Sequence, residues 1–133
     1  MIDVESDIYS AVSAALKAEF PGIWTSGEDA DLPARFPAVT IVEQDNAVKK
    51  DMRTLNIENA VGVMYEVNVY SNKVGYRKSE AKKIMATADR EMTRLGFTRT
   101  MMNPISNLQD ASIYRIVARY EADVDKDLWI YQS

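Results

Sequence analysis

Alternating carboxylates near the C-terminal end of the sequence are the first residues whose spacing suggests chemistry. Asp123, Asp125 and Asp127 stand at every second position of "DVDKD", as in the opening of a calcium-binding loop. Leu128 then occupies the position where such a loop needs glycine for its sharp turn. A solvated turn without a shared ion is therefore the better interpretation of this stretch.

A second acidic group lies in "GEDAD", where Glu28, Asp29 and Asp31 are close together. Three neighbouring carboxylates can share a hard cation or raise one another's pKa. No second motif of similar carboxylate density completes a site, so the pattern favours a hydrated loop. We expect neither a metal nor another cofactor.

Five cations surround the start of an expected helix in "NKVGYRKSEAKK", namely Lys73, Arg77, Lys78, Lys82 and Lys83. The stretch has a single glycine, so it is not a phosphate-cradling loop. Cations at a helix start also oppose the helix dipole, at a small cost in stability. The cluster is either a solvated face or a contact for an acidic partner.

The composition excludes several kinds of active site. The chain contains no histidine and no cysteine, so neither a Ser-His-Asp or Cys-His site nor a His- or Cys-ligated zinc site can form. General acid–base catalysis would depend on Asp, Glu, Lys or Tyr, and no catalytic set of these residues stands out. The sequence therefore favours an interaction protein over an enzyme.

Tyrosines and arginines interleave on the expected strands, which raises the question of nucleic-acid binding. Tyr114 and Tyr120 lie on the apolar face of "ASIYRIVARYEADVD", away from Arg115 and Arg119, so core packing is favoured over base stacking. The net charge of −4 gives no bulk attraction to nucleic acid or to an anionic membrane.

Apolar periodicity predicts the elements that must position these residues. Apolar side chains spaced by three and four predict helices over 3–20 and 77–95, with Gly96 just past the second one. Asp3 or Ser6 is expected to cap the first helix. Alternation or β-branched residues predict strands at 23–25, 38–45, 60–71, 97–106, 111–125 and 128–132, with a turn at 107–110.

This order predicts one α+β domain over residues 1–133, with a mixed, mainly antiparallel sheet and both helices on one face. The Tyr114–Val124 face would pack on the helices, and the charged face would meet water or a partner. The expected core includes Ile8, Val12, Leu16, Ile84, Ala88, Met92, Ile116 and Tyr120.

The polar stretch 46–59 is too long for a tight hairpin turn and is predicted to be an extended arm or loop. It carries cations and apolar groups that the core need not use, including Lys49, Lys50, Met52, Arg53 and Leu55. We expect this arm to contact a neighbouring subunit, with Glu28, Asp29 and Asp31 as acidic counterparts. An ordinary exposed loop is the alternative.

Most of the chain resembles the tail terminator, or tail completion, proteins of long-tailed bacteriophages. The resemblance lies in the strand end "VYSNK", the helix pattern "A-KKIM---D--M--LGF-R", the segment "N-P--NL-DA-IYR-V-RY-A-VD" and a closing "IY". The N-terminal half fits more loosely, through a helix followed by "FPAVTIVEQDN".

The resemblance implies a homo-oligomeric ring, commonly a hexamer, at the head-proximal end of the tail tube. Such a ring stops tube growth and joins the tail to the head connector, so the tail tube protein and the connector or stopper protein would be partners. DNA would only pass through the lumen, and no membrane would be involved. Arg115 and Arg119 would face a neighbouring subunit or that channel. The protein would be found in the virion tail, and in the host cytoplasm during assembly.

Two other functions stay open at this stage. One is another head–tail connector or minor capsid component, which shares this size and mixed architecture. The other is a small non-metal enzyme or ligand-binding module with a pocket between helices and sheet. The N-terminal "MIDVESDIYS" lacks the apolar run of a secretion signal, and no apolar stretch reaches the roughly 20 residues that span a bilayer.

Overall fold

The computed structural model describes residues 1–30, 32–49, 59–106 and 110–132. In these ranges the elements follow one another as two helices and six strands, in the predicted order. They are α1 (Glu5–Glu19), β1 (Trp24–Ser26), β2 (Ala38–Val48), β3 (Ala60–Ser71), α2 (Arg77–Arg94), β4 (Thr98–Ile105), β5 (Tyr114–Asp125) and β6 (Ile130–Gln132).

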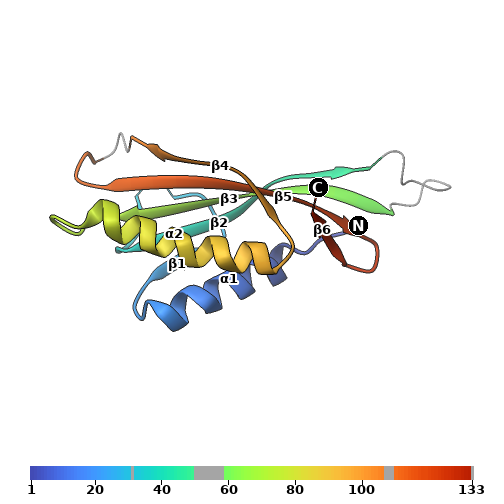
Figure 1. Cartoon of the computed structure of the whole chain (residues 1–133), viewed down its shortest axis with the longest axis horizontal. Coiled ribbons are helices and arrows are strands. Elements are labelled where there is room, and N and C mark those ends of the chain that lie inside the picture. Colours follow the sequence, from blue (N-terminus) through green and yellow to red (C-terminus); the bar gives the residue numbers. More distant parts are fainter. Residues whose placement is uncertain (31, 50–58, 107–109, 133) are drawn as a thin grey trace.

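The strands form one sheet in the order β1-β2-β3-β5-β4, with β6 also paired to β5. β1 runs parallel to β2, and all other pairs are antiparallel. β4 and β6 share one edge of β5, since β4 pairs with Arg115–Glu121 and β6 with Ala122–Val124. Both helices lie on one side of this sheet (Figure 1), so the predicted α+β fold is confirmed.

The core lies between the two helices and one face of the sheet. The eight core residues that the periodicity predicts are all buried, so that prediction is confirmed. Tyr65 and Phe97 meet edge to face there, with ring centroids 5.4 Å apart. α2 contacts α1 as well as β3, β4 and β5, and so covers the middle of the sheet. Neither helix in the described ranges is long and apolar enough to cross a membrane.

Of the two helix ends predicted from the sequence, the glycine end of α2 is confirmed and the side-chain cap of α1 is wrong. After α2, Gly96 adopts a φ of +104°, and its N–H bonds to the Thr93 carbonyl while the Phe97 N–H bonds to that of Met92. Gly96 thus lies just past the helix, as the sequence predicts, and the two bonds form a Schellman motif. At the start of α1 neither Asp3 nor Ser6 is the cap. Val4 precedes the helix, and Asp3 Oδ1 instead accepts the Glu5 N–H.

β2 differs most from its predicted form, because it continues three residues beyond Asp45, to Val48. The pairing register with β3 shifts at Gln44, which forms a bulge between Glu43 and Asp45. The bulge lets Glu43 pair with Tyr65 on the helix side and Asp45 with Met64 on the other. Residues 46–49 of the predicted arm therefore belong to the sheet or its end, and residues 50–58 lie outside the described ranges.

Thr40 provides a test of packing on the face without helices. Its side chain is fully buried, and within the described residues Thr40 Oγ1 is the buried side-chain polar atom that lacks a hydrogen-bond partner. Replacing Thr40 by valine should therefore raise the free energy of unfolding by about 1 kcal/mol. Chemical denaturation of the parent and the variant measures this difference.

Thr87 is the matched control, because its hydroxyl donates to Glu19 Oε2 at 2.8 Å and the residue is also buried. Thr87→Val should lower the free energy of unfolding by about 1 kcal/mol, the opposite sign. If both valine variants lose stability equally, the interpretation of Thr40 is wrong.

Candidate interaction surface

The face of the sheet without helices carries a strip of hydrogen-bonded charged and polar groups. The register places Glu66 opposite Arg119 and Tyr70 opposite Arg115. Arg119 Nε donates to Glu66 Oε2 at 3.1 Å, and Arg115 Nε donates to Asn68 Oδ1 at 2.9 Å. Asn68 Nδ2 closes the strip by donating to Glu66 Oε1 at 3.1 Å. Both predicted arginines are thus held against β3 by partners on the same face.

One end of this face is covered by the chain itself. The Arg115 guanidinium lies 5.3 Å from the centre of the Tyr70 ring, and the Tyr70 hydroxyl donates to the Ala30 carbonyl at 2.8 Å. Trp24 and Phe36 pack here against a small second core of Ala38, Tyr70 and Ile113. The loop after β1 therefore shields Tyr70, which lies on the same face as Glu66 and Asn68.

The other end of the face carries an ion pair between strands. Lys49, just past the end of β2, lies 3.3 Å from the carboxylate of Asp123 on β5. Gly62 of β3 pairs with Ala47 on one side and with Asp123 on the other, so it leaves the space between the two strands open. The pair is half exposed, so it adds little stability, but it fixes Lys49 at this end.

The predicted contact of Lys49 with the acidic loop joins two subunits, so a single copy does not test it. Glu28 and Asp29 lie in the loop after β1, near the first half of β2, whereas Lys49 follows the last residue of that strand. Asp31, Lys50, Met52, Arg53 and Leu55 lie outside the described residues. The structure thus brings Arg115 and Arg119 together on one face but leaves Lys49 far along the sheet from Glu28 and Asp29.

A tight turn between β5 and β6 presents aromatic side chains that sequence analysis treated only as a closing strand. Asp125 organises this C-terminal turn (residues 125–131): its carboxylate accepts the N–H groups of Asp127 and Trp129 and the hydroxyl of Tyr131. Trp129 is 67% exposed and Tyr131 is 53% exposed. Asp125 thus serves as a turn residue. No group of three or more acidic side chains in the described ranges is placed to hold a metal ion.

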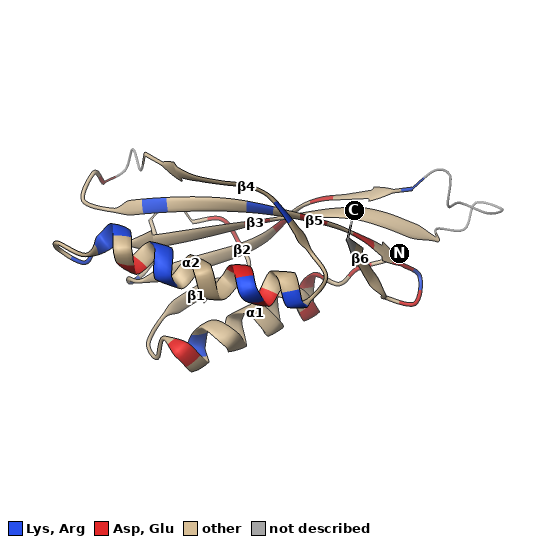
Figure 2. Cartoon of the chain, viewed as in Figure 1, with Lys and Arg blue, Asp and Glu red and all other residues tan. Residues whose placement is uncertain are grey.

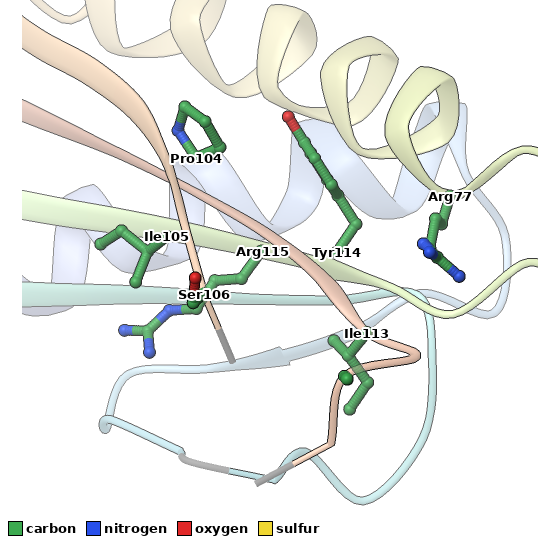
Figure 3. A pocket seen from close by; sticks show the side chains of 8 residues that line it. Arg77, Pro104, Ile105, Ser106, Ile113, Tyr114 and Arg115 are labelled. Atoms are coloured by element: carbon green, nitrogen blue, oxygen red, sulfur yellow. The ribbon is translucent and has the colours of Figure 1, made fainter. Parts of the chain in front are cut away.

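A pocket of about 380 Å³ opens where β4 ends and β5 begins. Arg77 comes to it from the start of α2, Ile105 from the end of β4, Ile113 from just before β5, and Tyr114 and Arg115 from its start (Figure 3). Its lining combines aliphatic and aromatic side chains with Arg77 and with Arg115, whose guanidinium is held by Asn68 and lies over Tyr70. We call it the Arg77–Arg115 pocket. It suits an apolar group that carries negative charge beside it.

Charge is distributed unevenly along the molecule. Cations gather around the start of α2, at the end that holds the Arg77–Arg115 pocket (Figure 2). Acidic groups gather toward the opposite end, around the C-terminal turn and the start of α1 (Figure 2). The groups that make up this anionic end are Asp3, Glu5, Asp7, Glu121, Asp123, Asp125 and Asp127, with Lys126 and the Asp123-bound Lys49 among them.

The tyrosines closest to carboxylates are not suited to acid–base chemistry near neutral pH. Tyr120 donates to Asp89 at 2.8 Å, and Tyr65 donates to Glu43 at 3.2 Å. Burial and the neighbouring carboxylate raise the pKa of each phenol far above its usual value. Both hydroxyls therefore act as structural hydrogen-bond donors at the edge of the core.

Glu43 gives the fold a predictable pH dependence. Burial, followed by repulsion from Glu5 and Asp3, raises the pKa of Glu43 above the ordinary 4.5, although the Tyr65 hydrogen bond opposes this. The folded state then binds the proton more tightly than the unfolded state. The stability that this proton contributes is lost as pH rises from about 4.5 through the raised pKa of Glu43. Glu43→Gln should remove this loss, so the variant should gain stability over the parent between about pH 4 and pH 7.

Urea denaturation at both pH values tests this expectation. Glu28→Gln serves as the control because Glu28 lies exposed in the loop after β1. An unchanged difference between Glu43→Gln and the parent across this pH range would contradict the expectation.

No model of a known protein family matches the sequence, and no curated protein sequence matches it either.

Proposed function

We propose that this protein is a ring-forming tail terminator of a long-tailed bacteriophage. It assembles as a homo-oligomer, expected to be a hexamer, on the head-proximal end of the tail tube. There it covers the surface to which the next tube subunits would add, and its other side receives the head connector. The proposal joins the sequence resemblance to a fold with the α+β architecture that the resemblance implies.

The paired arginines of the face without helices are the observation that carries the proposal. Arg119 is bonded to Glu66 and Arg115 to Asn68, so neither guanidinium is presented as an isolated cation. Binding to DNA phosphates gains most of its strength when free cations release counterions from the nucleic acid. An acidic protein with its arginines held in this way is suited to surround DNA that must slide past without being held.

Light scattering after size-exclusion chromatography, together with negative-stain electron microscopy, tests the ring. We expect particles of several subunits around a central opening. A related head–tail connector would also form rings, so a second measurement is needed. Tail tube protein from the same genome, polymerised with and without this protein, should give shorter, capped tubes only when this protein is present. An unrelated acidic protein of equal size is the control.

The outcomes separate the candidate functions. Rings that leave tube length unchanged indicate another connector or minor capsid component. A protein that stays monomeric at every concentration, both alone and with tubes, contradicts the proposal. Retention of duplex DNA at physiological salt would also contradict it, because the lumen would then hold the genome.

A further inference from the structure

The two ends of the molecule have complementary shapes. The C-terminal turn protrudes with Trp129 at its surface, whereas the Arg77–Arg115 pocket is hollow and lies toward the opposite end of the long axis (Figures 1 and 3). The turn is a narrow projection. The wall of the pocket includes Ile105, Ile113 and Tyr114, which offer apolar surface to an aromatic ring.

The two ends also have complementary charge. The projecting turn carries Asp127, an exposed carboxylate next to Leu128 and Trp129, within the anionic end. The pocket is bordered by Arg77, and Lys73 and Lys78 lie beside Arg77 in the sequence at the start of α2. Five cations near the N-terminus of a helix oppose the helix dipole. A contact with an acidic surface offsets this cost, which a solvated face would not do.

We infer that the C-terminal turn of one copy inserts into the Arg77–Arg115 pocket of a second copy. Trp129 then packs on the apolar wall, within reach of cation–π attraction from Arg77. Asp127 lies toward Arg77 and its lysine neighbours. The occupant is a second copy because this chain supplies both complementary surfaces.

Such a contact is heterologous, since it joins two different surfaces of the same chain. Repetition of a heterologous contact closes a ring when the rotation between copies allows it, and otherwise gives a filament. The inference rests on the proposed ring, for which it names the subunit contact. It also makes Trp129 the expected centre of that contact, because exposed tryptophans that become buried often dominate binding.

Charge reversal tests the contact without damage to the fold. Arg77→Glu places a negative charge at the start of α2, where the helix dipole favours it, and Asp127→Lys changes a side chain exposed in the turn. Each single variant should weaken self-association, measured by analytical ultracentrifugation, by at least about tenfold. The double variant Arg77→Glu/Asp127→Lys should restore it, because the two reversed charges again attract across the contact.

Trp129→Ala should weaken association by a similar factor of about ten or more, and circular dichroism confirms folding in each variant. Lys17→Glu is the matched control: it reverses an exposed cation on α1, outside both surfaces, and should leave association unchanged. In a Trp24→Phe background, Trp129 fluorescence should shift to the blue as the protein assembles, since the ring leaves water.

The outcomes distinguish this inference from the proposed function. If rings form and the charge reversals and Trp129→Ala leave them intact, the contact lies elsewhere and this inference is wrong, while the proposed function stands. If the single variants fail and the double variant does not recover, the two groups do not face each other and the inference is again wrong. A parent protein that never associates overturns both.

Discussion

Replacing Ile84 by alanine is expected to lower the free energy of unfolding by about 2–5 kcal/mol. Ile84 is 1% exposed and lies on the apolar stripe of α2, the helix that contacts both α1 and three strands of the sheet. Truncation removes three buried carbon atoms from a site whose neighbours belong to both layers. The layers cannot close around the resulting cavity without moving a helix, so much of the cavity should persist.

Equilibrium denaturation by urea measures this loss. Val74→Ala is the control, because Val74 is 89% exposed in the loop before α2 and its truncation should change stability by no more than about 0.5 kcal/mol. Leu16→Ala on α1 should resemble Ile84→Ala, since Leu16 is equally buried in the same core. Two core variants as stable as the control would mean that the helices do not pack on the sheet as described.

Replacing Gly96 by alanine should cost about 2–4 kcal/mol, from two separate sources. The first is the positive φ of +104°, which a residue with a Cβ atom adopts only under strain. The second is space: an added Cβ would lie 3.1 Å from Ile130 Cγ2 and 3.2 Å from the Ile130 carbonyl oxygen. Either the end of α2 or β6 must shift to accept the methyl group.

Gly22→Ala separates the two sources. Gly22 also has a positive φ, of +90°, but an added Cβ there would meet no atom within 4 Å. It should therefore show only the conformational cost of about 1–2 kcal/mol. The excess loss in Gly96→Ala, measured by thermal or urea denaturation, reports the contact with Ile130. Equal losses in the two variants would show that β6 moves away from the added methyl group without a measurable loss of stability.

The layers of the fold could be predicted because local periodicity and burial agree along most of the chain. The stripe through Ile84, Ala88 and Met92 has helical spacing, and the Val61–Val69 alternation has strand spacing, so each element indicates its own buried side. Gly96 was predictable for a similar reason, since only a residue without a side chain ends a helix easily in the left-handed conformation.

Features that depend on distant segments could not be predicted in the same way. The bulge at Gln44 has no sequence marker such as glycine, and it appears only as a shift in the β2–β3 register between Glu43 and Asp45. Tyr70 alternates with the Val61–Val69 face, but a loop some forty residues earlier covers it. Strand order was not predicted either: β4 and β6 pair with successive parts of the same edge of β5.

In the candidate interaction surface, too, local features could be predicted from the sequence and features that join distant segments could not. Arg115 and Arg119 could be placed on one face from alternation alone, yet their partners Asn68 and Glu66 depend on the β3–β5 register, which the sequence does not reveal. Trp129 follows the acids of "DVDKD" in the sequence, but its place in a projecting turn follows from how Asp125 folds that turn. The pocket joins α2 to the β4–β5 end, so it became recognisable only in three dimensions.

The central pair of strands should also govern amide hydrogen exchange. β3 and β5 pair with each other from Ala60–Asp125 to Ser71–Tyr114, and each has a second neighbour along most of its length. In the described chain β1 pairs with β2 only at Ala38–Thr40, so later residues of β2 form an outer edge. Amide protons in β3 and β5 should thus exchange through global opening, and those of edge strands through local fraying. The slowly exchanging band runs from the Arg77–Arg115 pocket to the C-terminal turn, so the most protected part of the sheet holds these two distant surfaces at a fixed separation.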